Sequence, residues 1–173
     1  KKKRKVFNLE NQAKILSRLN FSLTNDQKIT LNQINEDLKS NQKMFRLLQG
    51  DVGSGKTIVA LMAAYNVVKS GFQVAIMAPT DILARQHYKF AKKLFNNINI
   101  KILSSKTEYK EKKVITNELA DNKIDIIFGT HSIFQKKILF KNLGLIIIDE
   151  QHKFGVRQRK NLSDKGGNNC DVL

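Results

Sequence analysis

Short apolar runs alternate with amphipathic segments along most of the chain. The apolar runs predict five strands, at Phe45–Leu48, Gln73–Ala78, Ile98–Leu103, Ile124–Phe128 and Leu143–Ile148. Segments with a helical spacing of apolar positions lie between them, at Lys56–Lys69, Asp81–Phe95 and Glu108–Asp121. This repetition of strand, helix and strand predicts an α/β fold, in which a parallel sheet carries helices on both of its faces.

Two further helices are predicted before the first strand. One runs from Asn8 to Leu19, and the other begins after Thr24, a favourable N-cap residue with Asp26 and Gln27 in the first turn. The last strand, within "GLIIIDE", is apolar on both faces, which is typical of a central strand in such a sheet.

The excess of basic over acidic residues indicates which kind of partner the protein would bind. The 173 residues include 31 Lys and Arg against 15 Asp and Glu, a net charge of +16. This excess favours a polyanion such as DNA, although a lysine-rich composition that only maintains solubility gives the same count. Cys170 is the only cysteine, which excludes an internal disulfide and fits a reducing compartment. No apolar run approaches the ~20 residues of a membrane helix, so we expect a cytoplasmic protein with no membrane partner.

The first residues form a basic run, "KKKRKV". Such a run is either a nuclear targeting signal or a solvated arm or linker. We favour the arm, because nothing else in the sequence indicates a nucleus. Residues 1–20 are therefore expected to form a basic arm with a short helix, ahead of a domain over residues 21–173.

A glycine-rich turn, "GDVGSGKT", lies between the first predicted strand and a predicted helix. Its residues are Gly50, Asp51, Val52, Gly53, Ser54, Gly55, Lys56 and Thr57. The glycines allow several backbone N–H groups to point at one anion, and the following helix adds its positive end. Lys56 can reach the β- and γ-phosphates, and Thr57 can offer a hydroxyl to Mg²⁺. The spacing predicts a P-loop that binds ATP with Mg²⁺.

An acidic pair follows the last predicted strand. Asp149 lies where a carboxylate can hold the Mg²⁺ of a P-loop nucleotide, and Glu150 beside it can polarise an attacking water. The pair could instead only solvate a strand end. With a P-loop upstream, the two motifs together favour hydrolysis of the nucleotide.

Several segments resemble motifs of superfamily 2 helicases. "DEQH" at Asp149–His152 is similar to their D-E-x-H box, and "FSLTNDQ" at Phe21–Gln27 is similar to the segment whose glutamine recognises adenine. "APTDILARQH" at Ala78–His87 and "FGTHSIF" at Phe128–Phe134 resemble two motifs that contact DNA. The longer phrases "RLLQGDVGSGKT" and "LIIIDEQHKFGVRQR" resemble the RecG family of branched-DNA helicases, and the resemblance runs from about Phe21 to the C-terminus.

The resemblance implies a role for each matching residue. Gln27 would contact adenine. Lys56 and Thr57 would hold phosphate and Mg²⁺, and Asp149 would also bind Mg²⁺. Lys56 and Glu150 would be catalytic, with Glu150 as the general base. The other implied roles are a relay from nucleotide to DNA at His152 and DNA-backbone contacts at Thr80, Thr130 and His131.

The resemblance also implies parts that this sequence lacks, namely a wedge domain and a second RecA-like domain that supplies arginine fingers. We therefore expect residues 21–173 to be an incomplete first RecA-like domain that stops as a central strand begins. The ladder between Phe45–Leu48 and Leu143–Ile148 would then be unfilled, and the chain alone would hydrolyse ATP very slowly.

Two functions stay open. The chain is either the ATP-binding motor domain of a RecG-like helicase acting on branched DNA in repair and recombination, or a non-enzymatic remnant or module that binds nucleotide or DNA.

Overall fold

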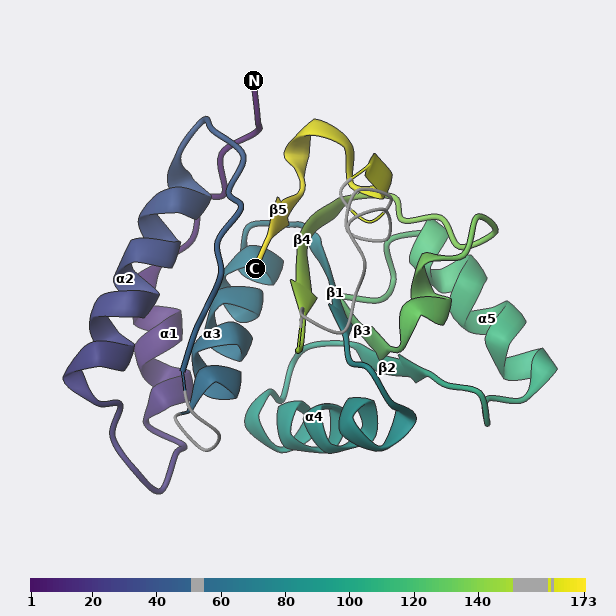
Figure 1. Cartoon of the computed structure of the whole chain (residues 1–173), viewed down its shortest axis with the longest axis horizontal. Helices are drawn as coiled ribbons and strands as arrows, with labels where there is room; N and C mark the ends of the chain where they lie inside the picture. The colour runs from purple at the N-terminus through teal and green to yellow at the C-terminus, as the bar shows by residue number, and fades with distance from the viewer. Residues whose placement is uncertain (51–54, 151–161, 163) are drawn as a thin grey trace.

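A parallel sheet forms the centre of the chain (Figure 1). The computed structural model describes residues 1–50, 55–150, 162 and 164–173. Within these residues, five strands pair in parallel in the order β2-β3-β1-β4-β5. Their bounds are β1 Gln73–Met77, β2 Ile100–Leu103, β3 Ile126–Gly129, β4 Leu143–Ile148 and β5 Asp171–Val172. The predicted α/β fold is confirmed, and β1 to β4 lie within two residues of their predicted bounds.

The helices also follow the sequence pattern. They are α1 Leu9–Leu16, α2 Asn25–Lys39, α3 Lys56–Lys69, α4 Asp81–Leu94, α5 Tyr109–Ala120 and the short 3-10 helices η1 His131–Phe134 and η3 Gly167–Asn169. Thr24 caps α2 as predicted, and it forms a capping box with Gln27. Among the described helices, none is long and apolar enough to cross a membrane.

Side chains of the strands alternate between two apolar clusters. On β1, Val74 and Ile76 pack in the cluster that contains most of the buried residues of α3 together with Ala91 and Leu94 of α4. Ala75 and Met77 point the other way, into the cluster that contains Ile115 of α5. Helices therefore cover both faces of the sheet, and Figure 1 shows α3 and α5 on opposite sides of it.

The segment before the P-loop differs from its prediction. Only Phe45 forms a bridge, with Val172, and the predicted strand Phe45–Leu48 is otherwise absent. The reason is that β5 offers few residues for pairing at this point, and Phe45 and Leu47 stay 63% and 60% exposed. Arg46 nevertheless donates its backbone N–H to the Val172 carbonyl at 3.1 Å.

The prediction of an unfilled ladder between the segment before the P-loop and β4 is also wrong. Val172 donates its backbone N–H to the Met44 carbonyl at 3.0 Å on one side. On the other side, Leu173 donates to the Ile146 carbonyl at 2.9 Å. The last residues of the chain thus lie between the segment that leads to the P-loop and β4, where the sequence predicted a central strand.

The basic run at the start of the chain is only partly solvated. Lys2 and Lys5 are buried, and their ammonium groups lie 3.0 Å and 2.7 Å from the carboxylate of Asp171, which is also buried. The Asp171 carboxylate also accepts the Met44 backbone N–H at 2.7 Å. Burial lowers the pKa of Lys5, and the hydrogen bond to Asp171 opposes that effect. Lys1, Lys3 and Arg4 stay exposed, and the division of the chain at residue 20 remains a prediction.

We expect Asp171→Asn to lower the free energy of unfolding by about 3–5 kcal/mol, because it leaves two buried ammonium groups without a counter-charge. Urea titration followed by circular dichroism measures this loss. Cys170 gives a local readout. Its burial raises the pKa of the thiol to about 12, so the parent should react slowly with a thiol reagent and the variant faster.

The matched control is Asp121→Asn. Asp121 lies 4.0 Å from Lys123 in an exposed ion pair, so its loss should change stability by no more than about 1 kcal/mol. Equal unfolding midpoints for the Asp171 and Asp121 variants would contradict the importance of the buried cluster.

Candidate functional site

Three neighbouring strands end at the edge of the sheet where the predicted site residues gather. β1 lies between β3 and β4, with Met77 opposite Gly129 on one side and Ile148 on the other. The predicted residues at this edge are Thr80 after β1, Thr130 and His131 after β3, and Asp149 and Glu150 after β4. Carboxyl ends of parallel strands are the usual position of ligand sites in open α/β sheets.

Helix α3 begins where the P-loop ends. Gly55 is its N-cap residue, with a left-handed φ of 78° and without a side chain that could cap the helix. The first turn of α3 has no acidic residue. Its N–H groups and positive helix end can therefore bind an anion. Lys56 donates from Nζ to the Gly50 carbonyl at 2.8 Å. Asp51, Val52, Gly53 and Ser54 lie outside the described residues.

Gln27 lies against the P-loop. Its Oε1 accepts the Thr24 backbone N–H at 2.9 Å, which completes the capping box of α2. Its Nε2 is so close to Gly55 that a Cβ atom on that glycine would come within 2.0 Å of it. The structure thus brings Gln27 to the nucleotide motif, while its contact with adenine remains a prediction.

Asp149 is held at the end of β4, beside the end of β1. Its backbone N–H donates to the Met77 carbonyl at 2.8 Å, and its carboxylate Oδ2 lies 2.8 Å from Nε2 of His87. The hydrogen bond from His87 lowers the pKa of Asp149, burial of the carboxyl acts in the opposite direction, and the positive charge of Lys56 assists the lowering. Asp149 is therefore ionised at neutral pH.

Glu150 follows with unusual backbone geometry. Its φ of 51° lies in the left-handed region, which is uncommon for a residue other than glycine. Its backbone N–H donates to the Asp149 carboxylate, and the residue is exposed. The tight turn after β4 thus presents both carboxyl groups at the edge of the sheet.

The residues at this edge fit a magnesium ion bound together with a nucleotide. Mg²⁺ prefers oxygen ligands and binds through one or two protein carboxylates together with substrate phosphates. Asp149 supplies an ionised, partly exposed carboxylate, and Thr57 supplies a hydroxyl in the first turn of α3. Lys56 adds the positive charge that phosphate oxygens require.

The predicted DNA-contacting residues lie at the same edge of the sheet. Thr80 is exposed and caps α4 by accepting the Leu83 N–H at 3.3 Å. Thr130 precedes η1, with its Oγ1 3.4 Å from the Ser132 hydroxyl, and His131 is exposed on η1. Their contact with DNA remains a prediction, and His152 lies outside the described residues.

The sequence pattern indicates no role for His87. The residue ends the segment Ala78–His87 and meets Asp149 across 62 positions of sequence. A local pattern gives no sign of such a contact. The only available signal was the helical spacing, which sets His87 two turns after the cap residue Thr80.

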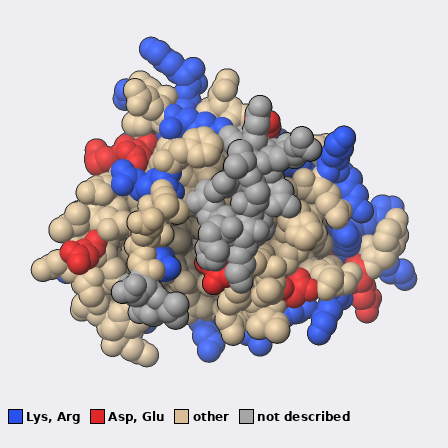
Figure 2. All heavy atoms as spheres, in the orientation of Figure 1, with Lys and Arg blue, Asp and Glu red and all other residues tan. Residues whose placement is uncertain are grey.

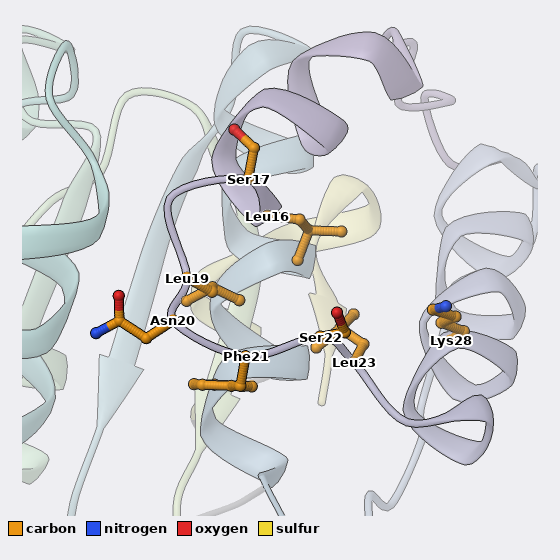
Figure 3. Close-up of a pocket in the computed structure, with 8 residues that line it drawn as sticks. All are labelled: Leu16, Ser17, Leu19, Asn20, Phe21, Ser22, Leu23 and Lys28. Atoms are coloured by element: carbon orange, nitrogen blue, oxygen red, sulfur yellow. The ribbon is translucent and has the colours of Figure 1, made fainter.

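A hollow lies at the connection between α1 and α2, close to the segment that contains Gln27 (Figure 3). Phe21, in this connection, is 54% exposed. Figure 3 shows the Leu19 and Phe21 side chains along the connecting loop, and it shows Lys28 on α2, across from that loop. The connection thus offers an exposed aromatic ring in the segment whose resemblance implies adenine recognition.

The sheet, the P-loop helix and the acidic pair after β4 define a nucleotide-binding domain of the helicase type. The chain belongs to the DEAD/DEAH box helicase family, whose model matches residues 24–169.

Two similar proteins carry the same name, ATP-dependent DNA helicase RecG. The chain is 48% identical over 155 residues to the ATP-dependent DNA helicase RecG of Aquifex aeolicus, covering 88% of this chain and 20% of the relative. It is 44% identical over 161 residues to the same helicase of Staphylococcus aureus (strain Mu50), covering 92% of this chain and 24% of the relative. The chain thus spans 20% to 24% of the length of these two relatives.

Solved structures agree with the fold. A structure of RecG bound to a three-way DNA junction superposes with a TM-score of 0.88 and 41% identity, over 98% of this chain and 23% of that one. The UvsW helicase of bacteriophage T4 superposes over 99% of this chain and 61% of that one, with a TM-score of 0.65. At 18% identity, the UvsW match supports the fold alone.

Gly55→Ala should destabilise the chain more than Gly71→Ala does. Both glycines have a left-handed φ, of 78° and 88°, so each substitution costs about 1–2 kcal/mol in backbone strain. An added Cβ at Gly71 meets nothing within 4 Å, whereas one at Gly55 displaces Gln27 from its capping box. Urea unfolding of the two variants measures the difference.

Gln27→Ala isolates the cause of that difference. In this background, the additional cost of Gly55→Ala should disappear, since there is no amide left to displace. A cost that persists unchanged would mean that Gln27 and Gly55 are not in contact.

Proposed function

We propose that this chain is the ATP-binding motor domain of a RecG-like ATP-dependent DNA helicase. The observation that carries the proposal is that α3, which begins with Lys56 and Thr57, packs against β1 and β4, and that Asp149 follows β4 directly. Residues 21–173 form this domain, and residues 1–20 form the basic arm and short helix that precede it. We propose that the protein is located in the cytoplasm, because such a motor acts on chromosomal DNA.

The bound nucleotide would be held from two sides. Its phosphates bind the N–H groups at the start of α3, the loop from Gly50 to Gly55 and the Lys56 ammonium group. Thr57 and Asp149 would hold Mg²⁺, and the bound ion would neutralise charge on the phosphates. Gln27, held by the Thr24 backbone against the P-loop, contacts the adenine.

Hydrolysis would require a base and additional positive charge. Glu150 is exposed at the same edge and orients the attacking water. Lys56 stabilises charge that develops on the γ-phosphate, and an arginine from a second RecA-like domain would add roughly 10³–10⁵ in rate. His152 relays the state of the nucleotide to the DNA side.

DNA would bind at the strand ends next to the nucleotide. Thr80, Thr130 and His131 contact its backbone, without reading the bases. Lys and Arg side chains are numerous on the face shown in Figure 2, especially over α5. The relative solved with a three-way junction supports branched DNA as the substrate of the whole protein.

Lys56→Ala should weaken binding of Mg·ATP below detection, because it removes the side-chain cation of the P-loop. Fluorescence titration with a labelled ATP analogue measures binding directly. Lys69→Ala is the matched control, since it removes an exposed lysine from the opposite end of the same helix. The nucleotide assignment is wrong if the Lys56 and Lys69 variants bind equally.

DNA binding should be independent of sequence and should weaken steeply with salt. Each phosphate contact contributes about −0.9 to the slope of log K against log salt for duplex DNA. Fluorescence anisotropy with two junctions of unrelated sequence, from low to moderate salt, tests both points. A flat salt response, or a strong preference for one sequence, would contradict phosphate-backbone binding.

These two binding measurements, together with an assay of ATP hydrolysis, separate the alternatives. Tight Mg·ATP and DNA binding with no turnover, even when the rest of a helicase is supplied, would favour the non-enzymatic binding module.

A further inference from the structure

His87 faces the candidate metal ligand from a different element. It lies on α4, whereas Asp149 follows β4, and their side chains meet at 2.8 Å between Nε2 and Oδ2. The His87 side chain is 18% exposed and that of Asp149 is 34% exposed. The pair is therefore partly shielded from water. Because the carboxyl is ionised, Nε2 donates to it.

Neighbouring contacts of α4 fix the position of the imidazole. Arg85 donates to the Ser104 hydroxyl at 3.0 Å, beyond the end of β2. Tyr88 meets Phe128 of β3 edge to face, with ring centroids 6.1 Å apart. Ala84, one turn before Tyr88 on the same helix, is buried. With residues on both sides of His87 anchored, α4 cannot rotate about its axis without breaking these contacts.

The other partner is equally constrained. The Asp149 backbone is tied to the Met77 carbonyl at 2.8 Å, at the end of the β1–β4 ladder. The carboxylate accepts hydrogen bonds from the Glu150 backbone N–H and, at Oδ2, from His87. Together they restrict its rotation about the side-chain bonds, and His87 supplies the contact from a side chain. A carboxylate with a fixed orientation binds a cation without losing further side-chain entropy.

We propose that His87 is a positioning residue of the nucleotide site, which orients the Asp149 carboxylate toward the magnesium ion of Mg·ATP. The proposal rests on the proposed function. It adds α4 to that site, the helix whose first turn is capped by Thr80. Hydrogen-bond partners of metal-binding carboxylates typically contribute about 10–100-fold to metal affinity.

A magnesium titration tests the proposal. The parent chain and its variants are mixed with a fixed concentration of a fluorescent ATP analogue, and MgCl₂ is added stepwise. His87→Leu should raise the Mg²⁺ concentration at half-maximal binding by about 10–100-fold, with metal-free nucleotide affinity unchanged. His87→Gln keeps an N–H donor near the position of Nε2 and should recover most of the loss.

Two controls separate positioning from folding. Gln86→Leu changes an exposed neighbour on the same helix and should leave the magnesium titration unchanged. In an Asp149→Asn background, His87→Leu should have no further effect, since its partner carboxylate is gone. If His87→Leu fails to fold, His87→Asn replaces it, because its shorter amide cannot reach Oδ2.

The outcomes are distinct. A parent chain that binds no Mg·nucleotide would overturn the proposed function itself. A parent that binds, together with a His87→Leu or His87→Asn variant of equal magnesium dependence, would overturn the positioning role alone. Failure of His87→Gln to recover binding would also count against it.

Discussion

The hydrogen bond from the Asp149 backbone to the Met77 carbonyl fixes the geometry on which the candidate site depends. It continues the parallel β1–β4 ladder, in which Val74 to Met77 pair with Leu145 to Ile148, by one further step. Helix α3 packs against both of these strands, so the P-loop helix and the acidic turn share one frame. A slip of one residue would exchange the β4 side chains between the two apolar clusters and displace Asp149 from the site.

Local pattern was sufficient for most of the fold. Helix α3 begins and ends at the residues predicted for it, and Thr24 caps α2, because apolar spacing and capping chemistry are encoded within a few neighbouring residues. Phe45–Leu48 failed as a strand, since strand formation depends on a partner and β5 pairs with this segment only near Val172. The P-loop and the acidic pair could be proposed from the sequence because their chemistry is confined to short motifs, and the roles of their residues remain predictions.

Contacts between distant segments were not predictable in this way. The basic run at the start of the chain predicted a solvent-exposed arm, yet Lys2 and Lys5 are buried against Asp171. His87 likewise gave no sign that it would meet Asp149. In each case the two partners are far apart in the sequence and are brought together by the tertiary fold, so composition and periodicity carry no information about the contact.

The cluster around Asp171 has a consequence for the order of events during synthesis. Lys2 and Asp171 are separated by 169 positions, so the lysine leaves the ribosome long before its partner exists. Helices and the inner strands can assemble meanwhile, because their contacts are closer in sequence. When β5 pairs with β4, it fills the sheet beside the segment that leads to the P-loop. The same step places Asp171 against Lys2 and Lys5 and buries all three side chains. A nascent chain that stalls before Asp171 would thus carry a formed helical layer, an open sheet edge and a basic segment, Lys1–Lys5, without its buried partner.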